Sequence, residues 1–260
     1  MMLLIGLVIG ALFLAGTHAL GGVALRRFVP DHQDPLLALG VGTIGVCQVA
    51  YLATLSPAMF DAIYLIAVAI PVLGLVAAIR PLKARGSAAI PRSWTERLAL
   101  LISVLLVLCV VAPPTMADAL DYHLGVPVYL LHHHAWPPTA LWLHGSLVGL
   151  GEVLTTLGLT IHSNSVATLL QALSLVLFAR YVSRGWTSTD RGFLQLFVLS
   201  APVVLFLVTG PKAQLFPAVL TACALHLTVQ NQRLDRQAFM LVCVLVMGAA
   251  QHKLPFVLSG

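Results

Sequence analysis

The sequence contains very little charge. Asp, Glu, Lys and Arg together make up 9% of its 260 residues, whereas a soluble domain carries roughly 25%. Hydrophobic residues make up 59%, and the mean hydropathy is +0.97. Because these apolar residues run in long blocks, the composition excludes an ordinary soluble domain and predicts an integral membrane protein.

Several functional motifs are also missing. The sequence has no GxxxxGK[ST] pattern. Its GxGxxG match at 40–45 lies inside an apolar block and lacks the strand-to-helix context of a dinucleotide site, so nothing predicts a nucleotide-binding domain. Its four cysteines show no CxxC spacing and fall inside apolar runs, which is typical of small core residues. The net charge of +5 does not indicate nucleic acid as a partner, because the basic residues lie in short loops between apolar runs.

The apolar blocks predict an all-α, polytopic transmembrane helix bundle of about eight spans, with an outer-face loop that carries interfacial helices. The first block lacks a basic leader, which favours an uncleaved span over a signal peptide. Pro113 and Pro114 end the fourth block, because proline cannot continue a helical hydrogen-bond ladder. The blocks are approximately 2–20, 35–55, 61–79, 98–112, 166–182, 192–208, 213–229 and 237–257.

The positive charges predict the orientation. Twelve of the fourteen Lys and Arg residues fall in four loops, provided that 113–165 forms one outer excursion. These loops, which we expect on the cytoplasmic side of a bacterial inner (plasma) membrane, are 21–34, 80–97, 180–191 and 230–236. The same bias predicts that 140–161 does not span. We expect it to form one or two helices in the outer interface, or a re-entrant segment.

Acidic and aromatic residues cluster where the chain leaves the fourth block. Asp118, Asp121, Tyr122 and Gly125 are spaced i, i+3, i+4 and i+7, which predicts one stripe on a helix. The segment 125–127, Gly-Val-Pro, is expected to break or kink that helix. The carboxylates could act chemically, or they could only cap and solvate an outer helix.

Other polar residues are predicted on the same outer side. Glu152 lies in a glycine-flanked apolar segment, where helix packing and a site role are both open. Lys212 precedes Gln214 by two residues between two spans, and His252 and Lys253 lie near the outer end of the last span. Ionisable groups at membrane depth often mark function, although the lysines could instead extend toward lipid phosphates.

These motifs resemble the GT-C superfamily of membrane glycosyltransferases, related to the dolichyl-phosphate-mannose protein mannosyltransferases and the bacterial aminoarabinose transferases. The stretch 118–123 is close to the D-x-x-x-Y-H form of some bacterial members. The stretch 209–215 is similar to a later outer turn in which Lys is often followed by Asp, here replaced by Gln214. The stretch 251–255 is similar to a K-x-P element. The resemblance covers about 95–260.

The resemblance implies transfer of a sugar from a polyprenyl-phosphate donor to an acceptor on the outer face. It favours Asp118 as the general base, with Asp121 as the next candidate or as a metal or substrate ligand. Lys212 or Lys253 would balance the charge of the phosphate leaving group. The candidate substrate-binding residues are Tyr122, His123, Lys212, Gln214, His252, Lys253 and Glu152. The implied partners are the lipid-linked donor and membrane lipids; no cofactor or metal site is assigned, and a divalent metal stays open.

The chain departs from the family at both ends. Residues 1–97 hold three extra spans and a basic cytoplasmic loop, and the GT-C-like region is 98–260. The chain also stops where the family continues, so we interpret it as a fragment or a reduced relative.

The alternative functions are a polytopic transporter, although no internal repeat is present, and a non-catalytic membrane assembly subunit. The adjacent histidines 132–134 favour a solvent-exposed loop over a zinc site, because three neighbouring side chains on a helix point in different directions. Trp136 is typical of an aromatic residue that anchors a helix at the membrane interface.

Overall fold

The computed structural model describes residues 2–79, 91, 93–110, 119–138, 149–208, 210–211, 214–230 and 234–252. Every regular element in these ranges is a helix, which confirms the all-α prediction. The elements are α1 (Met2–Phe28), α2 (Pro35–Thr54), η1 (Pro57–Met59), α3 (Asp61–Ile79), α4 (Trp94–Cys109), η3 (Ala119–Leu124), α5 (Gly125–His133), α6 (Leu150–Thr160), α7 (Val166–Val182), α8 (Ser188–Leu199), α9 (Pro202–Val208), α10 (Leu215–Gln230) and α11 (Arg236–His252).

Among the described residues, three helical segments are long and apolar enough to cross a membrane: α1, α2, and η1 with α3. The bent pair α8 and α9 would make a fourth span if it counts as one. Among the remaining helices, α4, α7, α10 and α11 have 16, 17, 16 and 17 residues, which is below the roughly 20 that a full crossing needs. The structure therefore supports a helical membrane protein and about half of the predicted crossings.

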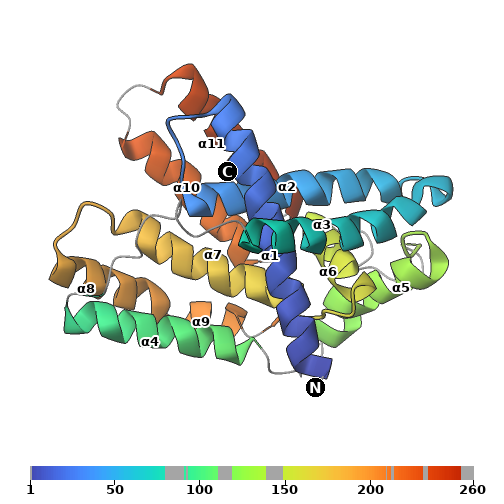
Figure 1. Ribbon diagram of the computed structural model, residues 1–260, viewed down its shortest axis with the longest axis horizontal. Helices are drawn as coiled ribbons and strands as arrows, with labels where there is room; N and C mark the ends of the chain where they lie inside the picture. Colours follow the sequence, from blue (N-terminus) through green and yellow to red (C-terminus); the bar gives the residue numbers. More distant parts are fainter. Residues whose placement is uncertain are drawn as a thin grey trace.

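The first three helices form a tightly packed unit. Figure 1 shows α1 lying across α2 and α3. Glycines lie where the helices meet: a Cβ atom on Gly42 of α2 would lie 1.8 Å from the backbone oxygen of Thr17, and one on Gly74 of α3 would lie 1.8 Å from that of Leu12. Only glycine permits such close backbone contact, which is a common arrangement between helices in membranes.

The predicted sixth span is broken. Helices α8 and α9 are bent by 64° at the residues between Leu199 and Pro202. Because proline disfavours helix in the residue before it, the helix ends ahead of Pro202 and a new one begins there. This break corrects the expectation of one continuous helix over 192–208.

Helix α6 corrects the expectation of a helix lying in the outer interface. Nine of its residues are buried, from Leu150 through Gly158. It packs against α2, α3, α5, α7 and α11, so it is inserted among the other helices. Its 11 residues are too few to cross a bilayer, as the sequence predicted. This geometry favours the re-entrant alternative for the described part of 140–161.

Segments that were predicted on the cytoplasmic side contact one another. Arg184, after α7, forms an ion pair with Asp34, which caps α2. The hydroxyl of Ser93, at the start of α4, donates a hydrogen bond of 3.1 Å to the carbonyl of Ser188 in α8. These contacts bring three of the predicted inner loops to one end of the bundle, which we call the inner end.

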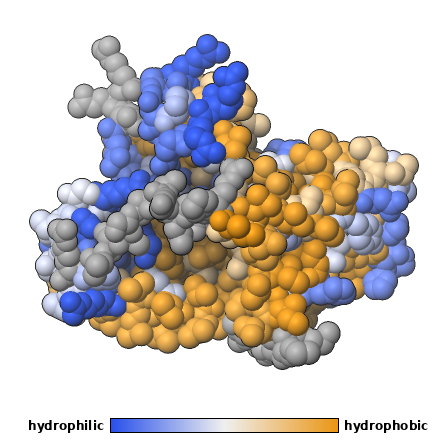
Figure 2. Space-filling view, viewed as in Figure 1, coloured by the Kyte–Doolittle hydropathy of each residue, from blue (hydrophilic) through white to orange (hydrophobic). Residues whose placement is uncertain are grey.

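Segments that were predicted on the outer side also meet. The Ser163 hydroxyl donates a 2.6 Å hydrogen bond to the carbonyl of Gly6 near the N-terminus. The indole nitrogen of Trp136 donates a 3.0 Å hydrogen bond to the Thr54 hydroxyl at the end of α2. Trp136 is therefore held by another helix. We call the part of the bundle where these contacts lie the outer end. Figure 2 shows one face of the whole molecule, on which a broad apolar surface is bordered by polar patches.

Candidate functional site

The segment that carries the predicted acidic motif is a π-helix, η3. A π-helix is wider than an α-helix and is rare, and it occurs frequently at functional sites. The spacing had predicted an α-helix with these residues in one stripe, and η3 is a π-helix instead. Helix α5 begins at Gly125, where a break or kink was expected. Asp121 is exposed, whereas Tyr122 and His123 are buried. Asp118 lies outside the described residues.

His123 is held by Glu152, which the sequence left open between packing and a site role. The Nδ1 atom of His123 lies 3.1 Å from Oε1 of Glu152, and each side chain is 2% exposed. The other carboxylate oxygen, Oε2, accepts a 2.9 Å hydrogen bond from the backbone N–H of Gly149. Glu152 therefore fixes both the start of α6 and the histidine of η3, and it serves packing and the candidate site together.

The end of α11 lies against this pair. A Cβ atom on Gly149 would lie 2.5 Å from the backbone oxygens of Gln251 and His252, so the loop before α6 and the end of α11 are in close contact. The Nδ1 atom of His252 donates to the carbonyl of Gly248 at 3.0 Å, and its ring packs edge-on against Phe216 at 4.9 Å between centroids.

His252 keeps one nitrogen without a partner. Its side chain is 1% exposed, and Nε2 has no hydrogen bond to any described residue. Since Nδ1 donates to a carbonyl, Nε2 is an acceptor in the neutral ring. A buried polar atom of this kind normally has a partner, so it is available to a ligand group that carries a donor.

The turn between α9 and α10, which carries Lys212, is held by a residue that the sequence analysis missed. Gln171, on α7, is 2% exposed. Its amide nitrogen donates to the carbonyl of Gly210 at 2.8 Å, and its amide oxygen accepts from the backbone N–H of Leu215 at 3.3 Å. One side chain thus fastens both ends of the turn. The available signal was a lone amide in an apolar helix, which is a typical interhelical hydrogen-bonding residue in membranes.

Replacing Gln171 with leucine should loosen this turn. The variant Gln171→Leu leaves the Gly210 carbonyl and the Leu215 N–H without their partner, which should cost about 2 to 4 kcal/mol. Ser174→Ala is the matched control on the same helix, because within the described part of the chain the Ser174 hydroxyl bonds only to the carbonyl of Gln171, one turn away. Thermal unfolding in detergent measures both variants. Equal midpoints for the two would contradict the assigned role of Gln171.

The structure brings together four of the predicted site residues: Tyr122, His123, Glu152 and His252. Gln214 is half-buried at the start of α10. Lys212 and Lys253 lie outside the described residues, so their roles stay predictions.

The histidine run does not form a metal site with other described residues, among which no group of three metal-ligating side chains occurs. His132 and His133 are exposed at the end of α5. His134 ends this helix in the left-handed conformation, and its ring stacks on Phe60 with a centroid distance of 4.2 Å. Two of the three histidines are therefore part of a helix and the third caps it, which differs from the expected loop.

Comparison with known proteins gives one match. A family described as the DUF1420 N-terminal domain matches residues 94–260, a stretch that begins at the first residue of α4 and contains every candidate site residue. No curated protein and no solved structure matches the chain.

Proposed function

The chain belongs to the family of the DUF1420 N-terminal domain, and from the site in the matched region we propose that it is a membrane glycosyltransferase of the GT-C type. It transfers a sugar from a polyprenyl-phosphate donor to an acceptor on the outer face of a bacterial inner membrane. The observation that carries this proposal is the buried pair of His123 and Glu152, which fixes a π-helix that presents Asp121 at the outer end.

The proposed chemistry is a displacement at the anomeric carbon of the donor sugar. A carboxylate, Asp118 or Asp121, takes the proton of the acceptor nucleophile while the new bond to the sugar forms. The bond from the sugar to the phosphate oxygen breaks, and polyprenyl phosphate leaves with the bonding electrons. Lys212 or Lys253 stabilises the negative charge of that leaving group. His123 and Glu152 act as positioning residues, because they hold the backbone that carries Asp121.

The proposal includes about eight membrane crossings with 113–165 on the outer side. It is supported by the contacts at the two ends of the bundle, each of which joins segments of the same expected side. In this proposal the short helices α4, α7, α10 and α11 cross a locally thin bilayer.

Release of polyprenyl phosphate from a labelled donor tests the proposal. Vesicles that contain the full chain would be incubated with polyprenyl-phosphate mannose or polyprenyl-phosphate aminoarabinose. We expect Asp118→Asn or Asp121→Asn to lower release at least about 100-fold, as the loss of a general base does. Asp31→Asn, an exposed carboxylate between α1 and α2, is the control and should leave release unchanged. Full release by both site variants, or none by the unmodified protein, contradicts the proposal.

The bent pair α8 and α9 favours one other function. Broken helices occur in secondary transporters, where the unwound backbone lines a substrate site. A transporter would move a solute across sealed vesicles without altering it, and this flux would not depend on Asp118 or Asp121. A non-catalytic assembly subunit would show neither release nor flux.

A further inference from the structure

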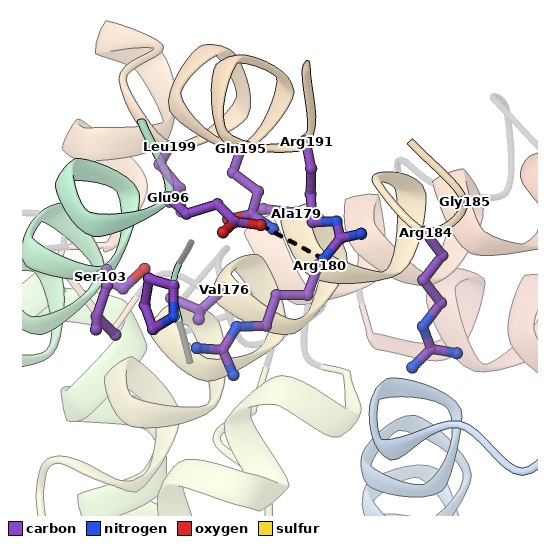
Figure 3. Close-up of a pocket in the computed structure, with 12 residues that line it drawn as sticks. Glu96, Ser103, Val176, Ala179, Arg180, Arg184, Gly185, Arg191, Gln195 and Leu199 are labelled. Atoms are coloured by element: carbon purple, nitrogen blue, oxygen red, sulfur yellow. Dashed lines mark ion pairs between the residues drawn. The ribbon is translucent and has the colours of Figure 1, made fainter. Parts of the chain in front are cut away.

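A cavity of about 650 Å³ opens at the inner end, away from the pair of His123 and Glu152. It lies among α4, α7 and α8 (Figure 3). Small-molecule sites typically have volumes of roughly 300–1,000 Å³, so the space is sufficient for a ligand. The residues that line it are Pro91, Glu96, Leu100, Ser103, Val176, Ala179, Arg180, Arg184, Gly185, Arg191, Gln195 and Leu199.

The walls of the cavity change from charged to uncharged and mostly apolar side chains along α4 and α8. On α4 the lining residues begin with Glu96 in the first turn and continue to Ser103 about two turns further on. On α8 they begin with Arg191 and end with Leu199. Both helices begin at the inner end, so the charged side chains lie at the end of the bundle and the apolar ones lie deeper. The cavity therefore has the polarity of an amphiphile.

Three arginines line the charged part, and two of them are already paired. Arg184 is paired with Asp34, and Arg191 lies 3.4 Å from a carboxylate oxygen of Glu96. The guanidinium group of Arg180 forms no ion pair or hydrogen bond with any described residue, and the Ser183 hydroxyl donates only to its backbone carbonyl. Figure 3 shows the Arg180 and Arg184 side chains diverging, with Arg180 lying toward Val176 and Ser103. One guanidinium is thus left to face the cavity.

A second arginine, Arg191, adds positive charge to the same lining. The Nε atom of Arg191 is buried and has no hydrogen-bond partner among the described residues, although its other nitrogens contact Glu96 and the carbonyl of Trp186. Guanidinium groups bind phosphate oxygens through pairs of parallel N–H donors. The Arg180 guanidinium, with the positive charge of Arg191 in the same lining and an apolar wall beyond them, fits a phosphate group attached to a hydrocarbon chain.

We propose that this cavity binds the phosphate head group of an anionic phospholipid from the cytoplasmic leaflet, with one acyl chain along the apolar wall formed by Leu100, Val176 and Leu199. The basic loops predict that this end faces the leaflet that is rich in anionic lipid. The inference does not depend on the proposed glycosyl transfer, because the cavity lies at the other end of the bundle and its test measures binding alone.

Lipid binding to the full chain tests the proposal. The protein in neutral detergent would be titrated with phosphatidylglycerol and, separately, with phosphatidylcholine, and the bound lipid would be counted by native mass spectrometry. We expect Arg180→Gln to weaken phosphatidylglycerol binding about tenfold or more, which is the loss of a charge-assisted hydrogen bond. Arg27→Gln is the matched control, since Arg27 is an exposed arginine at the end of α1 and its loss should change binding less than twofold.

Two further measurements identify the molecule that occupies the cavity. Val176→Phe narrows the apolar part, so it should weaken phosphatidylglycerol binding while thermal unfolding shows that the protein stays folded. Inorganic phosphate at millimolar concentration should not displace the lipid. Displacement by phosphate would show that the site takes a soluble anion and would overturn the lipid proposal. Equal binding of phosphatidylglycerol by the unmodified protein and by Arg180→Gln would overturn it as well.

Discussion

Replacing Glu152 with leucine should destabilise the protein by about 3 to 5 kcal/mol, the usual cost of removing one member of a buried polar pair. The variant Glu152→Leu leaves His123 Nδ1 and the Gly149 N–H without partners in a region where both side chains of the pair are 2% exposed. At roughly 2–4 °C per kcal/mol for a chain of this size, the unfolding midpoint in detergent should fall by about 10 °C.

Glu152→Gln should be far milder. The glutamine oxygen can accept from Gly149, and its amide N–H₂ can donate to Nδ1 of His123 if the imidazole carries its proton on Nε2. We therefore expect a loss of about 1 kcal/mol. Thr155→Val is the control on the same buried helix, because the Thr155 hydroxyl bonds only to the carbonyl of Gly151 one turn back. If Glu152→Leu unfolds at the same temperature as Thr155→Val, the pair does not hold the site together.

Replacing Gly42 with alanine should prevent normal packing of the first three helices. The added Cβ would lie 1.8 Å from the backbone oxygen of Thr17, and no side-chain rotation can relieve a contact between two backbones. We expect a loss of about 3 kcal/mol or more, as in severe overpacking, or failure of the variant to accumulate in the membrane.

Gly45→Ala on the same helix is the matched control. A Cβ atom there would meet nothing within 4 Å, and alanine is the better helix former by about 1 kcal/mol. This variant should be as stable as the unmodified protein, or slightly more stable. Unfolding in detergent and the yield of folded protein compare the two variants. Gly42→Ala with the stability of Gly45→Ala would show that α1 and α2 do not pack through this contact.

The hydrophobic pattern was sufficient to place most helices. The ranges predicted for 35–55, 61–79 and 166–182 differ from α2, α3 and α7 by at most one residue at either end, because Pro35 and Asp61 mark helix starts and the apolar runs are long. The break before Pro202 was also visible in the sequence, since proline ends a helix. The sequence analysis predicted one span there because the residues on both sides of the break are apolar and form one continuous hydrophobic block.

The candidate site could be predicted only in part. The spacing of the residues in 118–125 indicated a helix, but a π-helix has no pattern that distinguishes it from an α-helix at this length. Glu152 was recognised as unusual, yet its partner His123 lies 29 residues away, and sequence patterning reveals only neighbours within a turn or two. The inner-end cavity was missed because its arginines were interpreted only as orientation signals.

The close contact between Gly149 and the last turn of α11 has a consequence for the order of assembly. During synthesis, η3 and α6 leave the ribosome before α11 does, and both members of the pair of His123 and Glu152 lie in these earlier elements. His252, however, reaches the site only when the last described helix docks. The outer-end site is therefore completed only after α11 has inserted and docked, so a nascent chain cannot present it before that step.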